Sequence, residues 1–435
     1  MERFALSRMK EWKENENRKP LIIRGARQVG KTWIMKTFGQ QYFEKTAYVN
    51  FDNNARMKQV FEGDLDIERL VLSISAETGV SIEAENTLII FDEVQEVPKA
   101  LTSLKYFYEN APQYAIVAAE SLLGVALHQG TSFPVGKVDF LDLYPLNFRE
   151  FLCAMGEKQF VSMLDSCDTQ MVTVFKTKYI ERLREYYFVG GMPEVVKDFS
   201  EKKDYNRVRA IQKNLINYYQ QDFSKHAEIK LVPRLKLVWN SIPMQLAKEN
   251  KKYIYGQVRE GSRAKDFELA IQWLLDCGLI HKVQRIQKPD LPLKAYIDFD
   301  AFKLFLVDIG LLIAMTDLDA KVIIEGNKIF TEFKGALTEQ YILQQLISDV
   351  GVIPYYYSTQ NSKGEIDFLV QGKTSVIPIE VKAEENLKAK SLKAFCEKYQ
   401  PSYAVRTSMS DYREQDWMTN IPLYAVKWIK NYVNQ

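Results

Sequence analysis

A glycine-rich loop between a short apolar segment and a helical segment constrains this chain more than any other feature. Residues 21–24 read LIIR and lead directly into GARQVGKT at residues 25–32. This spacing matches the pattern GxxxxGK[ST], in which glycines let backbone N–H groups turn toward phosphate groups. The segment from Trp33 to about Gly39 is expected to be a helix whose N-terminus faces the anion. The predicted phosphate-binding residues are Gly25, Ala26, Arg27, Gln28, Val29, Gly30, Lys31 and Thr32.

Two side chains of this loop have separate predicted roles. Lys31 is expected to reach the β- and γ-phosphates of a nucleotide, and the Thr32 hydroxyl is expected to ligate Mg²⁺. A chance glycine-rich turn is the alternative, but the chain has only 20 glycines in 435 residues, and the flanking segments also fit. No guanine-specific NKxD motif follows, so ATP with Mg²⁺ is the predicted cofactor pair.

A second motif, LIIFDE at residues 88–93, follows at the distance expected of a partner to the loop. Four apolar residues predict a buried parallel strand that ends in two carboxylates. Asp92 is placed to hold the Mg²⁺ shell. Glu93 is placed to orient or deprotonate an attacking water. A strand ending in two acidic residues means little alone and gains its meaning from the loop before it.

Further strand and helix patterns extend the same domain. Strands are expected at 46–51, 114–119 and 137–143, and helices at 67–78 and 99–110. Strand–helix alternation predicts a parallel sheet covered by helices, with ligands at the carboxyl ends of the strands. We therefore expect a P-loop α/β domain over residues 1–155.

The N-terminal motifs resemble those of a prokaryotic AAA-type ATP-binding family. The resemblance is carried by GARQVGKT, LIIFDEVQEVP, SLLGVAL, PVGKVDFLDLYPLNFREFL and YYFVGGMPEVV. It implies a standalone ATPase with a C-terminal domain of unknown function. It also implies a polar residue after the fourth strand that senses the γ-phosphate, for which Ser121 is the candidate. Glu120 departs from the family pattern, and it either lies near the phosphates and slows hydrolysis or turns away into solvent.

An arginine that stabilises the γ-phosphoryl charge is expected in such an enzyme. Arg27, inside the loop, and Arg149, in PLNFREFL, are the candidates. Both are equally compatible with an ordinary surface position, and an arginine supplied by another copy would require an oligomer.

The middle of the chain is predicted to be helical. Residues 156–228 are expected to form a lid and linker, in which VGGMP at 189–193 is a loop between two helices. Residues 229–318 suggest a winged helix, with helices at 233–248 and 263–277 and wing strands at 279–286 and 296–299. DNA binding there would use the basic residues Lys251, Lys252, Arg259, Arg263 and Lys265. The alternative is a winged helix that only packs between domains.

The last segment, residues 319–435, resembles the PD-(D/E)xK nuclease superfamily. Its acidic residues come in the order Glu339 on a helix, Asp367 on a strand and Glu380-x-Lys382 on the next strand. The resemblance implies that Glu339, Asp367 and Glu380 hold Mg²⁺ or Mn²⁺ and that Lys382 stabilises charge or activates water. Glu-x-Lys occurs six times in the chain, so the triplet alone decides nothing, and Glu380 with Lys382 is equally an ordinary ion pair.

Composition limits the remaining function classes. A net charge of +2 disfavours a protein that coats polyanions, although a local basic face stays open. Four scattered cysteines and three scattered histidines favour a reducing compartment and disfavour a histidine metal site. No apolar run approaches the roughly 18 residues of a membrane span, and the N-terminus lacks a signal-peptide core, so we expect a cytoplasmic protein.

Two functions from different classes are compatible with this reading. In the first, ATP hydrolysis controls a nuclease-like domain that acts on nucleic acid. In the second, the chain is a nucleotide-operated switch whose C-terminal domain binds DNA or a protein partner and cleaves nothing.

Overall fold

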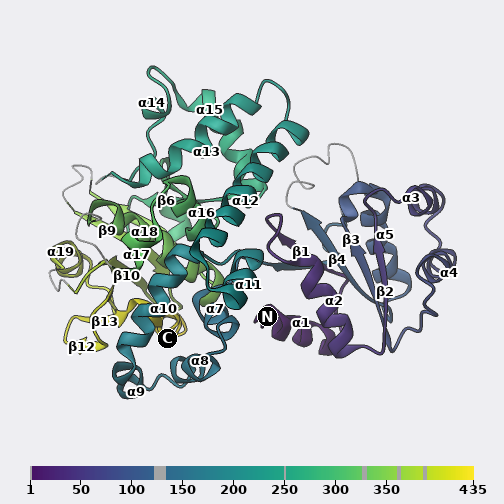
Figure 1. The fold of residues 1–435 in the computed structure, drawn as a ribbon, viewed down its shortest axis with the longest axis horizontal. Helices are drawn as coiled ribbons and strands as arrows, with labels where there is room; N and C mark the ends of the chain where they lie inside the picture. The colour runs from purple at the N-terminus through teal and green to yellow at the C-terminus, as the bar shows by residue number, and fades with distance from the viewer. Residues whose placement is uncertain (1, 122–133, 249–250, 326–330, 360–363, 386–388) are drawn as a thin grey trace. The chain divides into compact units, whose positions relative to one another are not determined.

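The computed structural model describes residues 2–121, 134–248, 251–325, 331–359, 364–385 and 389–435. The chain divides into two compact units (Figure 1). The N-terminal unit comprises residues 2–144 with 276–279, and the C-terminal unit comprises 145–275 with 280–435. None of the helices in these described ranges is both long and apolar enough to span a bilayer.

Five parallel strands form the sheet of the N-terminal unit, in the order β2-β3-β4-β1-β5. This confirms the predicted parallel α/β fold. The loop that follows β1 and the acidic residues that end β3 lie at the same edge, because parallel strands end on one side. The strands are β1 (Leu21–Gly25), β2 (Lys45–Asn50), β3 (Thr87–Asp92), β4 (Ala115–Ser121) and β5 (Asp139–Asp142).

Helices cover both faces of this sheet. On β3, Ile89 and Phe91 pack with side chains of α3, α4 and α5 in one apolar core. Their neighbour Leu88 faces the other way, toward Gly39 of α2. The predicted helix at 67–78 is α4, and the helix after the loop is longer than expected. The bounds are α1 (Ala5–Glu14), α2 (Lys31–Tyr42), α3 (Ala55–Glu62), α4 (Ile67–Thr78) and α5 (Pro98–Asn110).

The C-terminal unit begins with a helical region. A short buried loop between two of its helices contains Gly190 and Gly191, as predicted. A side chain on Gly190, whose φ is 74°, would meet Asp308 Oδ2 at 2.2 Å, and one on Gly191 would meet the Leu146 carbonyl at 2.1 Å. Asp308 also accepts the Gly191 N–H at 2.6 Å, so only glycines allow this packing. The helices are α7 (Phe148–Ala154), α8 (Lys158–Asp165), α9 (Thr169–Val174), α10 (Lys176–Val189), α11 (Pro193–Lys202), α12 (Tyr205–His226), α13 (Val232–Leu246), α14 (Tyr255–Val258) and α15 (Ala264–Asp276).

An eight-stranded mixed sheet forms the rest of this unit, in the order β12-β13-β11-β10-β9-β8-β6-β7. Strands β8, β9 and β10 run antiparallel in sequence, and β11 returns parallel to β10 after a helix. The bounds are β6 (Ile280–Ile286), β7 (Ile297–Leu306), α16 (Ile309–Met315), α17 (Ala320–Ile324), α18 (Thr331–Gln345), a π-helical turn (Leu346–Val350), β8 (Tyr355–Ser358), β9 (Glu365–Gln371), β10 (Val376–Val381), α19 (Lys390–Tyr399), β11 (Val405–Ser408), β12 (Arg413–Gln415), β13 (Met418–Pro422) and α20 (Ile429–Val433).

The elements of the predicted winged helix are present, but they are grouped differently. The expected helices are α13 and α15, and the expected wing is the antiparallel pair β6–β7. β6 also pairs in parallel with β8, at Arg285 with Tyr356 and Ile286 with Tyr357. The hairpin is therefore the edge of the C-terminal sheet and not a free-standing wing.

Candidate functional site

The glycine-rich loop turns as its sequence requires. Gly30 precedes α2 with φ 95°, a left-handed conformation that suits glycine. Gly25 ends β1 where a Cβ atom would lie 2.3 Å from the Leu143 carbonyl oxygen. These two positions allow the backbone to fold back on itself and begin a helix at Lys31.

Lys31 lies almost fully buried within this loop. Its Nζ donates to the carbonyl oxygens of Gly25 at 2.9 Å and Ala26 at 3.0 Å. Burial lowers the pKa of Lys31 to about 8, while the nearby carboxylates of Glu93 and Asp92 oppose the shift. The loop thus holds the Lys31 ammonium against two of its own backbone carbonyl oxygens.

Asp92 connects the loop to the end of β3. Its Oδ2 accepts from the Thr32 hydroxyl at 2.7 Å and from the Tyr48 hydroxyl at 2.8 Å. Burial and the Asp92 charge raise the pKa of Tyr48. The predicted pair Thr32 and Asp92 therefore comes together, and both offer the oxygen ligands that Mg²⁺ prefers. Tyr48 was not among the predicted site residues, because its only sequence signal is the β-propensity of its strand.

Glu93 lies just beyond β3 in an unusual backbone conformation. Its φ of 51° is in the left-handed region, which a non-glycine residue rarely adopts. Its carboxylate accepts from Gln95 Nε2 at 2.5 Å and stays half-buried. Strained residues of this kind often belong to functional sites.

Glu120 lies inside the unit and does not turn into solvent. It is fully buried on β4, in register with Arg24 of β1. Burial raises the pKa of Glu120 to about 7, and the charges of Arg24 and Lys31 oppose the shift. Of the two expectations for this residue, the structure agrees with a carboxyl group close to the loop. The side chain of Ser121, the last residue of β4, lies outside the described part of the chain.

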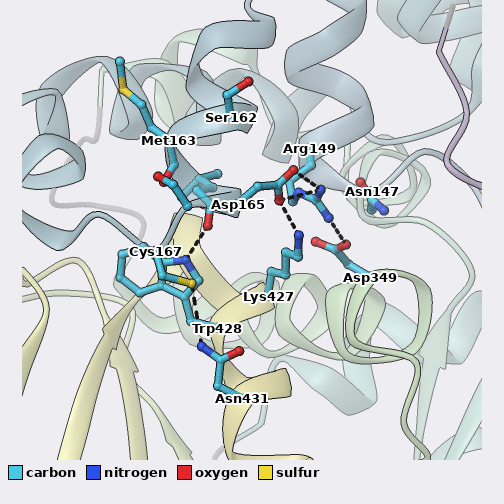
Figure 2. Close-up of polar contacts among 12 residues, drawn as sticks. Asn147, Arg149, Ser162, Met163, Asp165, Cys167, Asp349, Lys427, Trp428 and Asn431 are labelled. Atoms are coloured by element: carbon cyan, nitrogen blue, oxygen red, sulfur yellow. Dashed lines mark hydrogen bonds and ion pairs between the residues drawn. The ribbon is translucent and has the colours of Figure 1, made fainter.

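The two candidate arginines differ. Arg27 is half-buried in the loop, and its charge contributes to lowering the pKa of Lys31. Figure 2 shows Arg149 between Asp165 and Asp349 of the C-terminal unit, at 2.7 Å from each carboxylate. Arg149 is buried, so it is neither an ordinary surface residue nor a free guanidinium.

Glu339 and Asp367 come together in the C-terminal unit, and two lysines that were not predicted to lie there join them. Lys251 Nζ forms an ion pair with Glu339, and Lys303 Nζ lies 3.5 Å from it. Burial alone would raise the pKa of Glu339, but the two ammonium groups lower it. Burial and the Glu339 charge raise the pKa of Asp367, and the two side chains are hydrogen-bonded to each other.

Glu380 and Lys382 form a separate pair. Lys382 Nζ lies 2.7 Å from Glu380 Oε1. Glu380 is in register with Arg406 of β11, and its charge acts on Arg406 and Cys396. Within the described ranges, no group of three or more histidines, cysteines or carboxylates is arranged to hold a metal ion. The three-carboxylate metal set therefore stays a prediction.

The basic residues of the predicted DNA-binding helix do not all lie on one exposed surface. Arg259, Arg263 and Lys265 are exposed. Lys251 instead points its ammonium at Glu339.

Comparisons with known proteins match each part of the chain separately. A family model described as an AAA domain matches residues 17–152. Two models of domains of unknown function, DUF8612 and DUF4143, match residues 180–322 and 334–426. A search of the curated proteins found no match.

Several solved structures are similar at low identity. The Walker-type ATPase PabY2304 of Pyrococcus abyssi is 14% identical, with 72% of this chain and 95% of that chain covered and a TM-score of 0.44. The RuvB Holliday junction branch migration motor of Thermotoga maritima is 12% identical, with coverages of 64% and 87% and a TM-score of 0.30. Cdc6p of Pyrobaculum aerophilum is 9% identical, with coverages of 72% and 92% and a TM-score of 0.25.

The family match spans the strand, loop and acidic strand end that form the geometry described above. The C-terminal matches carry no function in their descriptions. Residues 17–152 therefore match an AAA domain, and this stretch contains the P-loop geometry described above.

Proposed function

We propose that this chain binds ATP with Mg²⁺ at the GARQVGKT loop and hydrolyses it. One observation carries the proposal: the Thr32 hydroxyl and the Asp92 carboxylate meet at 2.7 Å, directly beside the buried Lys31. Phosphoryl transfer requires a loop that binds the phosphates, ligands for the cation and a carboxylate near the attacking water, all at one place.

Each side chain of this site has a separate role in the proposed reaction. Lys31 pairs with phosphate oxygens, and the loop N–H groups hold the remaining phosphate charge. Thr32 and Asp92 would hold Mg²⁺, which neutralises charge on the phosphates when bound. Glu93 orients the attacking water and accepts its proton. Tyr48 keeps Asp92 Oδ2 directed at the loop.

Glu93→Gln is expected to retain ATP binding and to lower turnover at least about a hundredfold, because an amide cannot accept the proton of water. Steady-state phosphate release and ATP titration measure the two quantities. Glu96→Gln, which changes an exposed carboxylate in the same segment, is the matched control. Normal turnover in Glu93→Gln would move the base to another residue.

We further propose that the nucleotide state controls the C-terminal unit and that this unit acts on nucleic acid. Support comes from the acidic residues, which lie on α18, β9 and β10 in the expected order. Binding of ATP would shift a conformational equilibrium between the two units. We also propose that the protein is cytoplasmic. It would form an oligomer in which one copy supplies an arginine to the ATP site of another.

Asp367→Asn tests this C-terminal assignment. We expect it to abolish Mg²⁺- or Mn²⁺-dependent cleavage of plasmid and single-stranded DNA while ATP hydrolysis continues, because the two units carry separate sites. The asparagine carbonyl can still accept from the Val381 N–H, which lies 2.7 Å from Asp367 Oδ2. Cleavage that survives the change would exclude Asp367 from the site.

A non-cleaving switch is the second candidate function. One observation favours it: Lys251 and Lys303 already neutralise the Glu339–Asp367 pair that a metal ion would need. In that case ATP hydrolysis proceeds, neither DNA substrate is cut by the wild type, and the C-terminal unit binds DNA or a protein partner.

A further inference from the structure

A polar pocket lies in the C-terminal unit where β6, β8 and α19 meet. Its volume is about 480 Å³, within the range of small-molecule sites. Arg285 and Gln287 come from the β6 side, Tyr357 and Ser358 from β8, and Tyr399 from the end of α19. Nothing in the ATP site or in the Glu339–Asp367 cluster uses these residues.

The charged groups of the pocket favour an anion. Its described lining contains the cations Arg285 and Lys398 and no carboxylate. The Arg285 Nε donates to the buried Asp298 at 2.9 Å, which fixes the orientation of the guanidinium. Lys398 is exposed at the rim, so it supplies positive charge that no ion pair in the described ranges offsets. A phosphate group is the common ligand of an oriented guanidinium beside an ammonium.

The aromatic and hydroxylated part of the pocket adjoins the lysine, because Lys398 Nζ lies 4.9 Å from the Tyr399 ring centroid. Tyr357 and Tyr399 pack edge to face with centroids 5.6 Å apart, and their hydroxyls lie 2.8 Å from each other. Tyr357 is nearly buried, and Phe395 supports its ring at 5.4 Å, whereas Tyr399 is half-exposed. A planar base can stack on such a ring, and the Gln287 amide and Ser358 hydroxyl offer partners for its polar edge.

We propose that this pocket binds a nucleotide unit, with its phosphate at Lys398 and Arg285 and its base against Tyr399. A bare phosphate would leave the two tyrosines without a contact, and an apolar ligand would leave the Lys398 ammonium without an anionic partner. The unit belongs either to a free nucleotide or to single-stranded nucleic acid. The site is distinct from the P-loop and does not require ATP hydrolysis.

Calorimetric titrations of the full chain carrying Lys31→Ala test the proposal without interference from the P-loop. The probes are thymidine 5′-monophosphate, thymidine, inorganic phosphate and a short oligo-deoxythymidine. We expect the monophosphate to bind at least about tenfold more tightly than thymidine or phosphate, because only it contacts both sides of the pocket. An oligonucleotide that binds more tightly than the monophosphate identifies nucleic acid as the source, and equal affinity identifies a free nucleotide.

Lys398→Ala should weaken monophosphate binding about fivefold or more, since it removes the ammonium nearest the phosphate. Lys393→Ala is the matched control, because Lys393 is exposed on the same helix and does not line the pocket. It should leave the affinity unchanged within about twofold. The proposal is overturned by absent binding of both nucleotide probes, by phosphate binding as tightly as the monophosphate, or by equal effects of the two substitutions.

Discussion

Lys31→Ala is expected to weaken ATP binding about a hundredfold or more and to abolish hydrolysis. Lys31 is the buried cation of the loop, and its Nζ lies 2.9 Å and 3.0 Å from two loop carbonyl oxygens. A charge-assisted contact of about 3 kcal/mol corresponds to roughly that change in affinity. Alanine also leaves the phosphate charge without its closest side-chain partner during transfer. Titration with a fluorescent ATP analogue and a phosphate-release assay measure the two effects.

Lys10→Ala is the matched control for this substitution. Lys10 lies on α1 of the same unit and forms an exposed pair with Glu14 at 3.7 Å, so its loss should change neither binding nor turnover. A second readout follows from the pKa of Lys31, which burial lowers to about 8. The ammonium is present below this value, so wild-type affinity should fall as the pH rises through it. ATP hydrolysis retained by Lys31→Ala would contradict the assignment of the loop.

Local patterns were sufficient to predict the N-terminal unit. The strand, loop and helix around Lys31 are contiguous in sequence, and the apolar run before Asp92 identified β3 directly. Tyr48 could not be found in this way. Its contact with Asp92 depends on β2 lying beside β3, and strand order is a property of the folded sheet.

In the C-terminal unit, most features that could not be predicted are contacts between residues far apart in the sequence. Glu339 and Asp367 were expected to lie close together, and they do. Lys251, which pairs with Glu339, lies 88 positions before it in the sequence. Arg149 pairs with Asp349, which lies 200 positions later in the sequence. A hairpin pattern such as β6–β7 likewise does not specify which sheet edge it will join, so it suggested a separate wing. Charged residues and alternating apolar patterns can be recognised in the sequence. Which residues or strands they pair with is decided by tertiary packing.

Lys303→Met is expected to produce the largest loss of stability in the C-terminal unit, about 3–5 kcal/mol, because it leaves buried carboxylates unpaired. Lys303 is fully buried on β7. Its Nζ forms an ion pair with Glu365 and lies 3.5 Å from Glu339 and 4.9 Å from the Tyr356 ring centroid. Burial alone would lower the pKa of Lys303, but Glu339, Glu365 and Asp367 raise it overall. The ammonium is therefore held charged by its neighbours.

Hydrogen exchange of peptides from β7 and β9 measures this loss locally, which avoids treating a chain of two units as a single two-state transition. Lys334→Met is the matched control, because its partner Glu384 is 59% exposed and the pair should contribute at most about 1 kcal/mol. Adding Glu365→Gln to Lys303→Met should restore part of the stability, since it removes one of the charges left unpaired. If Lys303→Met costs no more than Lys334→Met, the cluster is not an electrostatic unit. Lys251 and Lys303 would then not take the place of a metal ion either.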